Sequence, residues 1–179
     1  MLNTPQQYVL PDLLPLIPFK GSFNPHYLEA ATASAAWAES YKVVPERKRT
    51  AFLQSAISSV IRKQDLYSYK MEQLSGLTGN NVLTVLMEQN HWTLQQASDH
   101  VGVHFKTLLD SFLSDKAQLP SWGPELDHAV SQFVMAMESW AVGNCEWSFA
   151  TLRYFGPERE EVKKTRVVRL RPKLLEDIA

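Results

Sequence analysis

The chain has 179 residues, which is enough for one domain with a sizeable core. Its hydrophobic fraction of 45%, charged fraction of 21% and net charge of −1 are ordinary for a globular protein and provide no polybasic surface for nucleic acid or lipid. The single cysteine, Cys145, excludes an internal disulfide and a multi-cysteine metal site. No stretch approaches the roughly 20 apolar residues of a membrane span, so we expect a cytosolic, single-domain protein over residues 1–179 without a stable membrane anchor.

The first predicted feature is an extended N-terminal arm over residues 1–24. This stretch holds four of the ten prolines, and proline lacks the backbone N–H that a helix interior requires. The arm also carries apolar residues that need cover, namely Leu13, Leu14, Leu16, Ile17 and Phe19. We therefore expect it to pack across the outside of the helices that follow.

Helical periodicity then recurs along the chain. Asn24-Pro25 begins a helix that runs to about Tyr41, and Pro45 begins another. Further helical segments are expected from Gln64 up to Gly76 or Gly79, over Asn80–Met87, after the capping-box pair Thr93 and Gln96, and from Pro124 to Gly156-Pro157. Residues 158–179 read as a highly charged tail.

One segment offers an alternative interpretation as a DNA-binding helix-turn-helix. Leu94, Ala97, Gly102 and Leu108 resemble that motif, whose turn glycine usually follows the alanine by four residues rather than the five found here. Asp99, Asp110 and Asp115 surround the same segment, which leaves no basic footprint for phosphates. We therefore expect no nucleic-acid partner.

The chemistry-bearing stretch is Gln64 to Glu72. In a helix, Gln64, Ser68 and Glu72 lie four residues apart on one face. Amide, hydroxyl and carboxylate oxygens suit a hard cation such as Mg²⁺ rather than zinc or copper. The alternative is a solvated helix face, because this spacing is common among polar residues.

This stretch resembles the second metal motif of class I terpene cyclases, Asn-Asp-x-x-Ser-x-x-x-Glu. Asp65, Ser68 and Glu72 match it, and Gln64 stands where the family has Asn. The run continues through Gly79-Asn80-Asn81-Val82 in a way similar to fungal sesquiterpene synthases. Two more blocks agree in order, one in the N-terminal arm and one near the C-terminus that contains Gly143-Asn144 and Arg153-Tyr154-Phe155-Gly156. The resemblance implies an all-α fold, a partial class I terpene-synthase-like helical bundle with an extended N-terminal arm.

The resemblance also implies a function and a site. The family uses Mg²⁺ to ionise farnesyl diphosphate, cyclises the carbocation and releases diphosphate. Carried over, Ser68 and Glu72 would ligate Mg²⁺ with Gln64 as the third ligand, and Arg153 and Tyr154 would bind the diphosphate. Arg153 has an alternative role as a cation near a helix C-terminus. Three residues of the long helix could face the prenyl chain or simply belong to the core: Trp140, Asn144 and Trp147.

One family feature is absent from this sequence. No Asp-Asp-x-x-Asp-like pattern occurs between Tyr41 and Gln64, where the family's first metal motif would precede the second. The sequence therefore predicts a synthase that lacks its central part. Two alternatives to catalysis stay open, namely a non-catalytic truncated helical protein that binds a partner, and a diphosphate-binding module without cyclisation.

Overall fold

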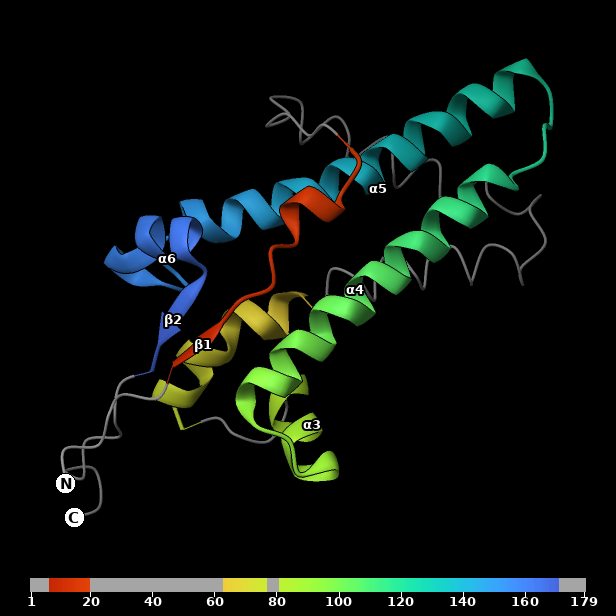
Figure 1. The fold of residues 1–179 in the computed structure, drawn as a ribbon. Helices are drawn as coiled ribbons and strands as arrows, with labels where there is room; N and C mark the ends of the chain where they lie inside the picture. Colours follow the sequence, from red (N-terminus) through yellow and green to blue (C-terminus); the bar gives the residue numbers. More distant parts are fainter. Residues whose placement is uncertain (1–6, 20–62, 77–80, 171–179) are drawn as a thin grey trace, which may run out of the picture. The chain divides into compact units, whose positions relative to one another are not determined.

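The structure is a computed structural model, and it describes residues 7–19, 63–76 and 81–170 (Figure 1). Helices make up most of these residues, which confirms the all-α prediction. After residues 63–74, which are helical, the elements are α3 (Val82–Asn90), α4 (Leu94–Ala117), α5 (Pro124–Ala150), η3 (Gly156–Glu158) and α6 (Arg159–Thr165). The arm contains β1 (Gln7–Val9) and η1 (Leu14–Leu16), and β2 (Val167–Arg169) follows α6. The two helices predicted between Asn24 and residue 62 lie outside the described residues.

The chain divides into two compact units. The first unit contains Met1–Leu13, Ile61–Phe105 and Glu146–Ala179, and the second contains Leu14–Val60 and Lys106–Cys145. Each is described below by itself. The interpretation of the whole chain as one domain stays a prediction.

In the first unit, the N-terminal arm pairs with the C-terminal strand. β1 and β2 are antiparallel, with Tyr8 opposite Val168 (Figure 1). The pairing extends by one bond, because the Leu10 N–H donates to the Arg166 carbonyl at 2.8 Å. Tyr8, Leu10 and Val168 are buried, so apolar side chains from both ends of the chain close the same core. The arm is extended, as predicted, and its first part is a strand.

Residues 158–170, which the sequence assigns to a charged tail, are folded. Val162 on α6 and Val168 on β2 are buried, so the charged residues between them occupy the exposed side of an amphipathic segment. Arg166 ends α6 in a left-handed conformation, with φ 62°, and so turns the chain into β2.

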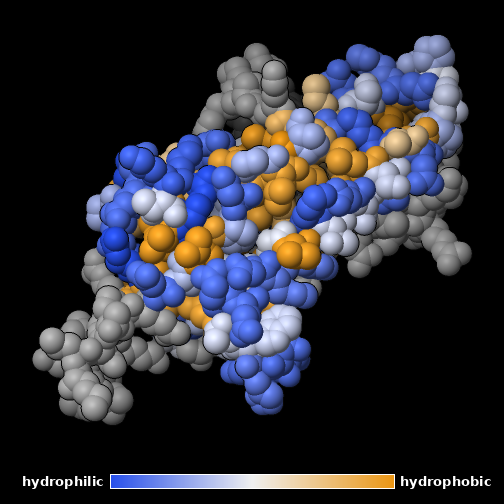
Figure 2. Space-filling model, viewed as in Figure 1, coloured by the Kyte–Doolittle hydropathy of each residue, from blue (hydrophilic) through white to orange (hydrophobic). Residues whose placement is uncertain are grey.

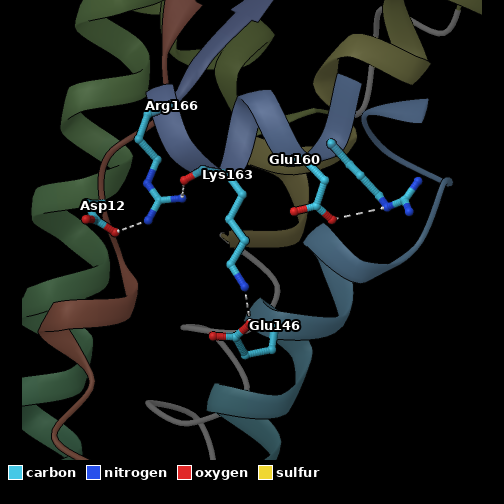
Figure 3. A network of polar contacts seen from close by, with 6 residues as sticks. Asp12, Glu146, Glu160, Lys163 and Arg166 are labelled. Atoms are coloured by element: carbon cyan, nitrogen blue, oxygen red, sulfur yellow. Dashed lines mark hydrogen bonds and ion pairs between the residues drawn. The ribbon is translucent and has the colours of Figure 1, made fainter. Parts of the chain in front are cut away.

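The Arg166 guanidinium joins three segments of the first unit (Figure 3). It donates to an Asp12 carboxylate oxygen at 2.7 Å and to the Lys163 carbonyl oxygen, and it lies 5.2 Å from the Phe149 ring centroid. Lys163 in turn pairs with Glu146 on α5 at 2.7 Å. Because Arg166 forms a planar fork above an aromatic ring, these contacts orient it more strongly than a single exposed ion pair would.

The capping box predicted before the amphipathic helix is confirmed. Thr93 N–H donates to Gln96 Oε1 at 2.8 Å, and Gln96 N–H donates to Thr93 Oγ1 at 3.2 Å, so each side chain caps the other's backbone. The helix that follows, α4, continues through Gly102 without a turn. The alternative helix-turn-helix interpretation is therefore wrong, because its turn is absent from a segment that the structure describes.

Gly102 has a packing role instead. A Cβ built on Gly102 would lie 2.6 Å from the Cβ of Pro11, inside the closest distance that real Cβ atoms reach. Only glycine at this position lets the proline-rich arm lie directly against the α4 backbone. The other glycine inside a described helix, Gly143 on α5, meets no described atom within 4 Å of such a Cβ.

In the second unit, Phe112 and Val134 form a buried pair that partly buried apolar residues surround: Phe19, Leu113, Leu119, Val130, Phe133 and Met137. Pro124 begins α5, as predicted. Asp127 accepts hydrogen bonds from Ser121 Oγ at 2.6 Å and from Trp122 N–H at 2.8 Å, and these bonds lower the pKa of the Asp127 carboxyl. The carboxylate thereby holds the loop that leads into α5.

Two predictions for α5 need correction. The helix ends at Ala150 rather than at Gly156-Pro157, because residues 151–155 form a turn that buries Tyr154 and Phe155. The alternative that Trp140 simply belongs to the core is also wrong, because this residue is exposed. On the face drawn in Figure 2, hydrophobic residues, in orange, reach the surface among hydrophilic ones.

We predict opposite effects for alanine at the two helical glycines. Gly102→Ala forces the arm away from α4 and should destabilise the protein by about 1–3 kcal/mol, as overpacked sites do. Gly143→Ala gains helix propensity without a clash and should stabilise it by up to about 1 kcal/mol. Urea unfolding followed by circular dichroism measures both changes, and equal stabilisation by the two variants would contradict the close packing of Pro11 on Gly102.

Candidate functional site

The helix over residues 63–74 has two chemically different faces. Its buried face carries Leu66 and Tyr67, and the Tyr67 ring packs 5.2 Å from Phe149 and 5.7 Å from Phe155 between centroids. The stacked pair Phe149 and Phe155 comes from α5 and the turn after it. This aromatic cluster fixes which side of the helix points away from the core.

The opposite face lines a pocket with a volume of about 560 Å³. Two segments of the first unit line it, which are the 63–76 segment and the turn after α5. The lining residues are Gln64, Asp65, Ser68, Met71, Glu72, Ser75, Arg153 and Tyr154. All three side chains predicted as metal ligands and both predicted diphosphate-binding residues therefore lie around one cavity.

Both oxygens of the Glu72 carboxylate have protein donors. Ser68 Oγ donates to Oε1 at 2.5 Å, and Asn81 Nδ2 donates to Oε2 at 2.9 Å. Asn81 also donates to the Asp65 carbonyl at 2.7 Å, and the Val82 N–H donates to Asp65 Oδ2 at 3.2 Å. The start of α3 is thus attached to both ends of the helix over residues 63–74, which we call the motif helix.

Arg153 and Tyr154 follow the end of α5 and reach the pocket from its other side. The Tyr154 ring is buried and packs edge-on against Trp147, with centroids 5.9 Å apart. The Arg153 guanidinium lies 5.8 Å from the Tyr154 ring centroid. Stacking on an aromatic ring leaves the guanidinium edge able to donate hydrogen bonds to an anion.

A partly buried ion pair connects these two walls of the pocket. Lys70 Nζ lies 2.5 Å from Glu158 Oε2, and the Lys70 side chain is only 6% exposed. Lys70 belongs to the motif helix and Glu158 ends η3, just after Arg153 and Tyr154. The pair therefore helps to set the separation of the two lining segments.

The side chain of Tyr8, in the N-terminal arm, contacts the helix over residues 63–74. Its hydroxyl donates to the Leu66 carbonyl at 3.1 Å, and its ring packs edge-on against Tyr69. Burial raises the pKa of Tyr8 well above its usual range, and the nearby Tyr69 and Glu72 raise it further. The phenol is consequently neutral across the physiological range and remains a hydrogen-bond donor to the motif helix.

Comparison with known proteins agrees with this geometry. Residues 31–111 match the family model described as terpene synthase family 2, C-terminal metal binding. The chain is 46% identical over 106 residues to alpha-muurolene synthase of Coprinopsis cinerea. The aligned residues are 59% of this chain and 25% of the relative. Over these residues the chain is similar to fungal terpene synthases.

Two further fungal terpene synthases align over a longer part of the chain. Bifunctional terpene synthase Agr4 of Cyclocybe aegerita is 45% identical over 122 residues, which is 68% of this chain and 34% of the relative. Sesquiterpene synthase 6 of Postia placenta is 42% identical over 120 residues, 67% of this chain and 35% of the relative. The chain thus spans between 25% and 35% of the length of these three relatives.

The oxygen donors of the pocket suit the metal-binding character of this terpene synthase family, which implies a divalent metal. Among the residues that the structure describes, no three His, Cys, Asp or Glu side chains gather as a ligand set. A metal here would accordingly be held by Glu72 together with the neutral oxygens of Gln64 and Ser68. That donor set fits a hard cation. Across the described residues, no helix is long and apolar enough to cross a membrane.

The residues predicted to face a prenyl chain have different surroundings. Trp147 contacts Tyr154 and is 41% exposed, and it does not line the pocket. Trp140 and Asn144 lie on the part of α5 that belongs to the second unit, where Trp140 is 52% exposed. Their role toward a prenyl chain stays a prediction.

Two positions that shape the site, Asn81 and Lys70, are not among the residues predicted for it. Asn81 precedes the apolar Val82-Leu83, and that pattern signals a helix N-cap, although nothing in it points to Glu72. The pairing of Lys70 with Glu158 spans 88 positions and has no local signal. Both contacts arise from tertiary packing.

We predict that Lys70→Met destabilises the protein by about 1–3 kcal/mol, because it removes the ammonium that lies 2.5 Å from the Glu158 carboxylate in a partly buried place. The matched control is Lys106→Met, which removes an exposed pair with Asp110 and should change stability by less than about 0.5 kcal/mol. Thermal and urea unfolding of the three proteins compare them directly. Equal stability of the Lys70 and Lys106 variants would contradict a structural role for the partly buried pair.

Proposed function

We propose that the pocket binds the diphosphate group of farnesyl diphosphate together with Mg²⁺, and that the chain acts as a sesquiterpene synthase that ionises and cyclises this substrate with release of diphosphate. The observation that carries the proposal is the convergence of Gln64, Ser68 and Glu72 with Arg153 and Tyr154 on one cavity. The relatives named as sesquiterpene synthases support a substrate with a C15 chain.

Each lining residue has a defined task in this proposal. Glu72, Ser68 and Gln64 would supply oxygens to Mg²⁺, and a bound Mg²⁺ would neutralise negative charge on the diphosphate leaving group. Arg153 donates to phosphate oxygens from the opposite wall, and its planar fork suits two of them at once. The Tyr154 ring supports Arg153, since it is buried and holds the guanidinium over its face.

Placing cations on two sides of the leaving group is what the chemistry requires. A diphosphate leaves with several negative charges, and the transition state is stabilised by donors already oriented toward it. The aromatic cluster and the Lys70–Glu158 pair hold the two walls before substrate arrives, so this orientation costs little at the moment of reaction.

A second candidate is binding of the diphosphate without turnover. It is favoured by one specific observation, the lack of an Asp-Asp-x-x-Asp-like pattern between Tyr41 and Gln64. In that case the pocket would retain one metal and the substrate, while the carboxylates for further metals would be missing. This candidate predicts Mg²⁺-dependent binding and no hydrocarbon product.

The binding proposal is tested with Mg²⁺ and inorganic pyrophosphate by isothermal titration calorimetry. Glu72→Ala and Arg153→Ala should each weaken pyrophosphate binding by about 10- to 100-fold, which is the loss of a charge-assisted contact worth about 1.5–3 kcal/mol. Arg169→Ala is the control, because this exposed arginine pairs with Glu161 and does not line the pocket. Binding that needs no Mg²⁺, or that survives both substitutions, would sink the proposal.

Gas chromatography of the volatile products formed from farnesyl diphosphate and Mg²⁺ separates the two candidates. A cyclic sesquiterpene that disappears in Glu72→Ala supports the synthase. Pyrophosphate binding with no hydrocarbon product, from protein with a native circular dichroism spectrum, supports the binding module.

A further inference from the structure

Asn81 is a buried amide between α3 and the motif helix. The residue is only 1% exposed, and both the oxygen and the nitrogen of its side-chain amide have hydrogen-bond partners. Oδ1 accepts from the Leu83 N–H at 2.9 Å, and Nδ2 donates to the Asp65 carbonyl at 2.7 Å and to Glu72 Oε2 at 2.9 Å. The residue is therefore both the N-cap of α3 and a donor to the candidate ligand.

The network permits one orientation of this amide. Its oxygen faces a backbone N–H, and its nitrogen faces a carbonyl and a carboxylate, which accept and cannot donate in these forms. Turning the amide over would set oxygen against oxygen at Asp65 and Glu72 and leave the Leu83 N–H without its acceptor. The Asn81 N–H that donates to the Glu72 carboxylate therefore has a fixed direction, because the bonds to Leu83 and Asp65 hold the amide in place.

We propose that Asn81 is the positioning residue of Glu72, holding Oε2 so that Oε1 stays beside Ser68 and directed to the metal position. This inference rests on the proposed function, because it assigns Glu72 to the metal. Ser68 alone would hold only Oε1 of Glu72 and would leave the carboxylate able to rotate about the Cγ–Cδ bond. Asn81 removes that freedom from outside the motif helix, and a second bond from Val82 N–H to Asp65 fastens the same junction.

The chemistry of an amide suits this task better than that of a cation. A lysine or arginine at this place would hold Glu72 equally well, but its charge would repel the divalent ion that Glu72 is meant to bind. A neutral N–H orients the carboxylate and leaves its negative charge available. Partners that hydrogen-bond a metal ligand in this way are typically worth about 10- to 100-fold in metal affinity.

The test separates this role from helix capping. Asn81→Ser and Asn81→Thr retain a side-chain oxygen that caps α3, but they lack the amide N–H groups that reach Glu72 and Asp65. Asn81→Ala removes both. Mn²⁺, which prefers the same oxygen ligands as Mg²⁺, serves as the probe, and the electron paramagnetic resonance signal of the free ion measures its binding with and without inorganic pyrophosphate.

We expect all three variants to bind Mn²⁺ about tenfold more weakly than the unsubstituted chain. Only the alanine variant should also lose the stability of the cap, measured by thermal unfolding. Asn90→Ser is the control, because this exposed asparagine at the end of α3 donates from its side chain to the Leu86 carbonyl at 3.1 Å and does not line the pocket, so Mn²⁺ affinity should stay unchanged.

Two results would overturn the inference, and they are distinguishable. Folded serine or threonine variants that bind Mn²⁺ as tightly as the unsubstituted chain would show that Asn81 serves as a cap alone, while the proposed metal site stands. An unsubstituted chain that binds no Mn²⁺ in either condition would remove the metal site itself, and the proposed function with it. If one variant does not fold, the other decides between these outcomes.

Discussion

The site depends on the two-faced character of the helix over residues 63–74. Tyr67 is buried against Phe149 and Phe155, because a large aromatic ring gains free energy when its apolar surface leaves water. With 3.6 residues per turn, burying this residue directs Gln64, Ser68 and Glu72 away from the core. The polar face is thus a consequence of where the aromatic face packs, and the pocket forms where the turn after α5 meets it.

Contacts distant in the sequence then decide how well the polar face is held. Asn81 and Val82 attach both ends of the motif helix to the start of α3, and Lys70 attaches it to Glu158. These bonds lie in places with little water, where a lost partner leaves a desolvated polar group behind. The candidate ligand Glu72 is therefore oriented by its tertiary surroundings as much as by its own helix.

The two ends of the described chain contribute to the same unit. β1 and β2 pair, Arg166 bridges to Asp12, and the close approach of Pro11 to Gly102 seats the arm on α4. Through Tyr8, the arm also donates to the backbone of the motif helix. A chain that covers only part of the length of its terpene synthase relatives thus still assembles the face on which Gln64, Ser68 and Glu72 lie.

The sequence by itself determined the helical class, the capping box at Thr93, the start of α5 at Pro124 and the family, because these features depend on local spacing or on a motif read along the chain. It also named the residues that line the pocket from both sides, since Ser68, Glu72, Arg153 and Tyr154 stand in matching blocks. Only the tertiary structure decided that α5 ends at Ala150 and that the charged segment after Glu158 folds into α6 and β2. Those outcomes, like the bonds of Asn81 to Glu72, rest on packing between different segments of the chain, and local periodicity carries no information about such partners.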